Sequence, residues 1–230
     1  MLTRSIRWVY RTPRLFYRAV STLSSNSHIK IFRDPISPSS HILTYLESDP
    51  PSKRLAIGTS AAIPPTPSSF KENHDFVKIL EDVVREYGHQ DEDVVSQARA
   101  FASTGGFNLG SGGSFFPQQQ SDRGHSAKQG GGGGAGGSGA GGASAQGGAG
   151  GGGRGGFVHL SDRRNPPDFG RIAWPEDILG SVEVNEKGEV VGKVQPSGTY
   201  RVLTNEGILG LSPFLRGKLV ERLRQEAAKG

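Results

Sequence analysis

A tract dominated by glycine, serine, alanine and glutamine runs from residue 105 to residue 156 and divides the chain in two. The chain has 230 residues and 35 glycines, most of them in this tract. Such a composition has little to bury, so we expect a flexible, disordered linker. About 50 such residues span on the order of 40 Å, enough to join two bodies or to loop out of one. Strands before the linker can therefore still complete a sheet after it.

The part after the linker, residues 157–230, begins with a strand pattern. Valines alternate with polar residues at 182–184, a turn containing glycine follows at 185–188, and valines return at 190–194. This pattern predicts a β-hairpin, because alternation with period two is typical of a half-buried strand and glycine suits a tight turn. Residues 200–204 form a further alternating run, which predicts a third strand.

The end of the chain has a helical pattern. Ser212 is suited to be an N-cap and Pro213 to be the first helical residue. The apolar residues that follow are spaced to lie on one face: Phe214, Leu215, Leu219, Val220 and Leu223. The sequence therefore predicts an α+β fold, with a small C-terminal antiparallel sheet and one amphipathic helix.

Two segments precede the linker. We expect residues 21–68 to form an extended segment with short strands near 28–32 and 55–58. Residues 69–104 predict a helical hairpin, whose first helix starts at a capping box of Ser69 and Glu72. Four apolar residues recur at helical spacing: Phe76, Leu80, Val83 and Tyr87. Gly88 stands where a C-terminal cap belongs. A second helix is expected over 92–103.

The first 20 residues have the composition of a targeting segment. They contain five arginines and no acidic residue, with the arginines spaced three and four apart on one helical face: Arg4, Arg7, Arg11, Arg14 and Arg18. This predicts a mitochondrial transit peptide over 1–20, cleaved near Ser21 and delivering the protein to the matrix side. The alternative is an amphipathic arm that binds a membrane surface or nucleic acid.

Removal of this segment changes the charge argument. The whole chain has a net charge of +5, and losing five arginines leaves a net charge near zero. A single Arg-Gly unit at Arg154 lacks the interleaved aromatic residues of single-strand binders. Charge therefore argues against a nucleic-acid partner. No apolar run approaches the length of a membrane span.

Motifs for chemistry are missing from the sequence. The chain has no cysteine, which excludes disulfides and thiolate chemistry, and its six histidines lack the spacing of metal ligands. The glycine tract lacks the Lys-Ser/Thr of a phosphate loop. We therefore expect no cofactor, no metal and no catalytic residue. Five residues could supply acid–base groups: His159, Asp162, Asp168, Glu176 and Asp177. The four carboxylates have structural explanations, in turns or in the first turn of a helix, whereas His159 is left without one.

One irregular segment, residues 157–177, mixes aromatic, proline and charged residues. Such loops supply the residues that dominate protein interfaces. The candidate interaction residues are Phe169, Arg171, Trp174, Glu176 and Asp177. The alternative is that Trp174 and Phe169 cover one edge of a small core.

The stretches GRIAWPEDILGSVEV and PSGTYRVLTNEGILGLSPFL, after a glycine-rich tract, resemble a family of uncharacterised fungal mitochondrial proteins. The resemblance covers the C-terminal third and residues 55–114, and it implies localisation alone. Together these observations predict a non-enzymatic mitochondrial interaction protein, an accessory subunit or assembly factor of a larger protein complex. An RNA- or ribosome-associated factor and a small enzyme are the alternatives.

Overall fold

The computed structural model describes residues 21–48, 50–102, 156–168 and 171–229. Over these residues the protein combines antiparallel sheets with three α-helices, which confirms the α+β class. The segment 1–20, expected to be a transit peptide, lies outside the described residues. So does the expected linker, apart from Gly156, which is the first residue of a strand.

The first part of the chain forms a five-stranded antiparallel meander. Its strands neighbour one another in chain order: β1 (Ser21–Leu23), β2 (Asn26–Arg33), β3 (His41–Thr44), β4 (Gly58–Ser60) and β5 (Phe70–Glu72). Ile29, Ile31 and Leu43 point into the main core, while Phe32 and Ile42 on the opposite face belong to a separate small cluster. In the described residues these strands share no ladder with the C-terminal sheet.

Two helices follow this sheet. α1 (His74–Tyr87) and α2 (Glu92–Ala102) are joined by a 3-10 turn, η2 (Gly88–Gln90). Phe76, Leu80 and Val83 are buried at the spacing that the sequence predicted, and Tyr87 is partly buried. Gly88 is the C-cap of α1 in a right-handed conformation. A Cβ on Gly88 would lie 2.9 Å from Cγ2 of Val194, so the absence of a side chain permits close packing there.

The expected capping box of Ser69 and Glu72 is wrong. Glu72 ends β5, and its Oε2 accepts a hydrogen bond from the Val202 N–H at 3.0 Å. The N-cap of α1 is Asn73, whose side chain accepts from the Asp75 N–H at 3.1 Å. Pairing with β4 uses the backbone groups of β5 that a helix would need, so the tertiary contact overrides the local signal.

The second part of the chain contains a three-stranded antiparallel sheet in the order β6 (Gly156–Ser161), β7 (Ile178–Val184), β8 (Val190–Pro196). The hairpin of β7 and β8 is the predicted one, with Gly188 at a φ of 73° in its turn. The third strand is β6, however, and the expected strand at 200–204 is wrong. There only β9 (Leu203–Thr204) forms, in a separate pair with β10 (Gly207–Ile208).

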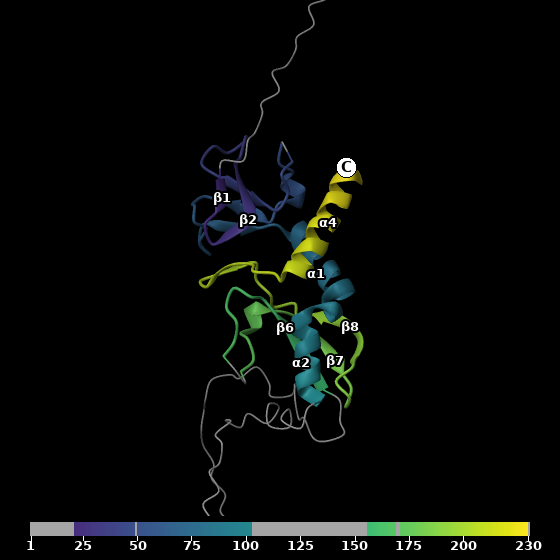
Figure 1. The fold of residues 1–230 in the computed structure, drawn as a ribbon. Coiled ribbons are helices and arrows are strands. Elements are labelled where there is room, and N and C mark those ends of the chain that lie inside the picture. Colours follow the sequence, from purple (N-terminus) through teal and green to yellow (C-terminus); the bar gives the residue numbers. More distant parts are fainter. Residues whose placement is uncertain (1–20, 49, 103–155, 169–170, 230) are drawn as a thin grey trace, which may run out of the picture.

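The chain ends in α4 (Pro213–Lys229), which packs against α1. Ser212 is its N-cap as predicted, because its Oγ accepts from the Leu215 N–H at 3.1 Å. Leu215, Leu219 and Leu223 of α4 are buried in the main core. This core takes residues from both sheets and from the helices. Figure 1 shows the two sheets at opposite ends of the molecule, with α1 between them.

Candidate functional site

A buried carboxylate directly after β6 organises the irregular segment that the sequence singled out. Asp162 is 1% exposed. Its Oδ1 accepts from the backbone N–H groups of Arg164 and Gly210, both at 2.8 Å, and its Oδ2 accepts from the Tyr200 hydroxyl at 2.6 Å. Burial raises the pKa of Asp162, and the positive charge of Arg164 and these hydrogen bonds oppose the rise. Asp162 therefore ties three separate loops together.

The Arg164 side chain forms the second half of this anchor. Its Nε donates to Oδ1 of Asp177 at 2.7 Å, and the two side chains are only 3% and 1% exposed. Its terminal nitrogens donate to the carbonyl oxygens of Val202 at 3.0 Å and Glu176 at 2.9 Å. The guanidinium carbon also lies 5.3 Å from the centre of the Tyr200 ring. A buried ion pair is tolerated when its hydrogen bonds are satisfied in this way.

The close approach of the chain at this anchor requires a glycine. A Cβ on Gly210 would lie 2.9 Å from the backbone nitrogen of Arg164 and 3.0 Å from Oδ1 of Asp162. Because the Gly210 N–H must reach Asp162, any side chain at position 210 would push the two loops apart. We call Asp162, Arg164, Asp177, Tyr200 and Gly210 the buried anchor.

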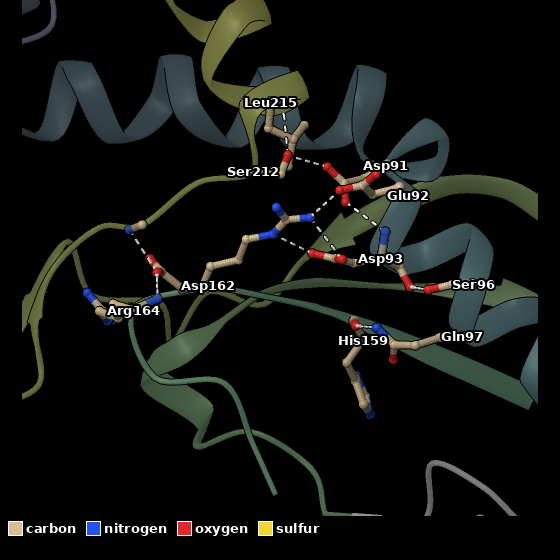
Figure 2. A network of polar contacts seen from close by, with 12 residues as sticks. Asp91, Glu92, Asp93, Ser96, Gln97, His159, Asp162, Arg164, Ser212 and Leu215 are labelled. Carbon is tan, nitrogen blue, oxygen red and sulfur yellow. Dashed lines mark hydrogen bonds and ion pairs between the residues drawn. The ribbon is translucent and has the colours of Figure 1, made fainter. Parts of the chain in front are cut away.

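A second polar network joins the buried anchor to the helices, as Figure 2 shows. Arg163 donates to Glu92 at 2.8 Å and to both carboxylate oxygens of Asp93, at 2.8 and 2.9 Å. The fully buried Asp91 accepts from the Ser212 hydroxyl at the start of α4. It also accepts from the Asp93 N–H at 3.0 Å. Arg163 thereby fixes the first turn of α2 to the loop after β6, and Asp91 links the start of α2 to the start of α4.

The segment before β7 is exposed, although its end is fixed. The carbonyls of Trp174 and Pro175 accept from the Asp177 N–H and the Thr199 hydroxyl, each at 2.8 Å. Trp174 is nevertheless 71% exposed, and Ile172 two residues earlier is 49% exposed. The protein therefore presents a large aromatic side chain on a backbone that the buried anchor holds.

The predicted interaction residues divide into two groups. Trp174, Arg171 and the Glu176 side chain are exposed, and Arg171 lies 4.0 Å from Asp168 in a solvent-exposed ion pair. Asp177 is buried in the anchor, at the end of the 3-10 turn η3 (Pro175–Asp177). Phe169 lies outside the described residues. One segment of the chain therefore contains both the exposed residues and the buried Asp177, which ties that segment to the anchor.

Sequence reasoning missed Arg164 and Tyr200 as parts of the anchor and did not select Ile172. Short-range signals existed for Asp162, which precedes two arginines, and for Asp177, which follows Pro175 in a short turn. Tyr200 lies 38 positions after Asp162, and no local pattern connects the two. Long-range pairing of this kind follows from the fold.

The acid–base residues show one further contact of chemical interest. Nδ1 of His159 lies 2.7 Å from Oγ of Ser181, and burial lowers the pKa of His159. A serine that acts as a nucleophile needs a neighbouring base such as His159, and that base also needs a third group that orients its ring. Nothing in the described residues bonds the other ring nitrogen of His159, and His159 and Ser181 are simply opposite each other on β6 and β7. The described residues also contain no cluster of three possible metal ligands.

Comparison with protein families, curated proteins and solved structures finds no match to this chain. No helix within the described ranges has the length and apolar character needed to cross a membrane.

Proposed function

We propose that this protein is a non-enzymatic mitochondrial interaction protein, an accessory subunit or assembly factor of a larger protein complex, and that Trp174 is central to its interface. The observation that carries this proposal is the exposure of Trp174, 71%, on a backbone fixed by the buried anchor. Tryptophan is among the residues that contribute most to binding energy in protein interfaces.

Both the apolar area of Trp174 and the order of its backbone favour binding. A tryptophan side chain can bury roughly 150–250 Å², so covering an exposed one is worth about 3 kcal/mol. The hydrogen bonds to the carbonyls of Trp174, Pro175 and Glu176 fix the backbone before binding, which reduces the entropy lost on association. Ile172 adds apolar area, and the exposed charges of Arg171 and Glu176 suit a polar rim.

The mitochondrial part of the proposal is supported by the arginine spacing of residues 1–20. We expect these residues, fused to a fluorescent protein, to direct it to mitochondria, and we expect the chain without them to remain outside. A fusion in which glutamine replaces the five arginines is the control. Import of that control would contradict the transit-peptide assignment.

The interaction part is tested by native affinity purification from mitochondria of the source organism, with and without nuclease. We expect a defined set of proteins in both arms. Trp174→Ala should reduce their recovery at least about tenfold, as for an interface hot spot. Phe157→Ala is the matched control, because Phe157 is also exposed, 44%, but lies on β6. Loss of the partners only after nuclease treatment would favour the RNA- or ribosome-associated factor instead.

A further inference from the structure

A pocket of about 420 Å³ lies between α4 and the β2–β3 region of the five-stranded sheet, apart from the Trp174 segment. Its polar walls come from His28 and Lys30 of β2, Glu47 after β3, and Arg216 and Arg224 of α4. Its volume is within the range of roughly 300–1,000 Å³ that is typical of small-molecule sites. The size and the basic side chains together suit a small anionic ligand.

The cations of the pocket are arranged on facing surfaces. Arg216, Val220 and Arg224 are four residues apart, so they share one face of α4. His28 and Lys30 share one face of β2 by strand periodicity. In the described part of the chain no carboxylate forms an ion pair with Arg216 or Arg224, and the one acidic residue of the pocket, Glu47, pairs with Lys30 at 3.1 Å. Two guanidinium groups are therefore available to a ligand.

Tyr45 also lines the pocket and is only 6% exposed, and its hydroxyl is enclosed by the protein. A ligand in the pocket therefore meets the ring of Tyr45 and not its hydroxyl.

We propose that this pocket binds a small organic phosphate, with Arg216, Arg224 and Lys30 holding the phosphate oxygens. A phosphate suits the site better than a carboxylate, because it offers more acceptor oxygens to several cations at once. The apolar side chain of Val220 and the ring of Pro213 also line the pocket and can contact the organic part of the ligand. This site is separate from the interface proposed at Trp174.

The test is isothermal titration calorimetry of the full chain, at low salt, with inorganic pyrophosphate as the probe. We expect one pyrophosphate per chain, and at least about tenfold weaker binding in Arg216→Gln and in Arg224→Gln, because each loses a charge-assisted contact. Arg222→Gln is the matched control, because it removes the same charge from the same helix without touching the pocket. Trp174→Ala should leave pyrophosphate binding intact.

Four results would overturn the proposal. The first is no saturable binding of pyrophosphate to a chain that circular dichroism shows to be folded. The second is an equal loss in Arg222→Gln, which would indicate general attraction to a basic surface. The third is citrate binding as tightly as pyrophosphate, which would point to a carboxylate. The fourth is poly(U) RNA binding many chains per strand with the same dependence on Arg216 and Arg224, which would point to a nucleic acid.

Discussion

At the scale of single residues, Arg163 and Arg164 are neighbours in the chain with opposite surroundings. Arg164 and its partner Asp177 are 3% and 1% exposed, whereas Arg163 is 35% exposed and binds Glu92 and Asp93 near the surface. Replacing Arg164 leaves a buried carboxylate without its counter-charge, which typically costs about 3–5 kcal/mol. Exposed pairs contribute about 0–1 kcal/mol.

We therefore expect Arg164→Met to lower the free energy of unfolding by about 3–5 kcal/mol and Arg163→Met by less than about 1 kcal/mol. Methionine keeps most of the aliphatic volume, so the comparison isolates the guanidinium group, with its charge and its hydrogen bonds. Urea unfolding followed by circular dichroism measures both values. Similar losses for the two variants would show that the buried anchor does not stabilise the fold as described.

Asp162 predicts a dependence of stability on pH. Burial raises its pKa above the ordinary value of 3.8, against the opposing charge of Arg164, so the folded state holds this proton more tightly than the unfolded state does. The stabilising contribution is complete below the ordinary pKa and is lost as the pH rises through the raised one. Asp162→Asn removes this titration and leaves the other groups in place.

The free energy of unfolding of the natural chain, minus that of Asp162→Asn, should accordingly fall as the pH rises from below the ordinary pKa of 3.8 through the raised pKa of Asp162. Urea unfolding of both proteins at several pH values gives this difference. A difference that rises with pH would mean that the contacts of Asp162 with Arg164, Gly210 and Tyr200 outweigh its burial.

At the scale of elements, Ser212 and Asp91 couple the starts of two helices. Ser212 caps α4 through the Leu215 N–H, and its hydroxyl also donates to Asp91, which caps α2 through the Asp93 N–H. We expect Ser212→Ala to cost about 2 kcal/mol, the upper end of the range for an N-cap, because it also deprives a buried carboxylate of a donor.

The matched control for this helix cap is Ser96→Ala. The Ser96 hydroxyl donates to the Asp93 carbonyl on the exposed side of α2. We expect that change to stay within about 0.5 kcal/mol. Thermal unfolding of the two variants and of the natural chain measures both losses of stability. Equal losses in Ser212→Ala and Ser96→Ala would contradict the coupling of α2 and α4 through Asp91.

The elements with strong local patterns could be predicted from the sequence. The apolar spacing of α1, the turn between β7 and β8, and the cap of α4 are all short-range signals, and each agrees with the structure. The start of α1 was not predicted, because Ser69 and Glu72 have the pattern of a cap while β5 pairs with β4. Pairing between strands depends on distant residues, which local periodicity does not contain.

The third strand of the C-terminal sheet follows the same principle. Residues 157–160 alternate as well as residues 200–204 do, and only the fold decides that β6 pairs with β7. The exposed part of the candidate site was predictable from its composition. The buried anchor was not, since its members are brought together from the loop after β6, from η3 and from the loops around β9 and β10.

At the scale of the whole molecule, the parts before and after residues 103–155 share one core. Asn26 donates to the Leu209 carbonyl at 3.1 Å, and the Val202 N–H donates to Glu72 at 3.0 Å. The main apolar cluster also draws on both parts. Separating the parts would expose this shared surface, so hydrophobic burial should hold them together without a covalent link.

We expect a chain cut at a protease site inserted within residues 103–155 to elute as one complex in size-exclusion chromatography, and to separate only in urea. The uncut chain is the reference for the elution volume. Elution of two independent fragments without denaturant would contradict the single shared core.

The most direct test of the interaction proposal is site-specific photo-crosslinking in mitochondria. A benzophenone amino acid in place of Ile172 keeps Trp174 and the buried anchor intact, and the same probe at Val191 is the control, since Val191 is similarly exposed, 47%, but lies on β8. We expect strong crosslinks from position 172 to one or a few proteins, lost in Trp174→Ala, and few from position 191. Equal, diffuse crosslinking from both positions would contradict an interface at Trp174.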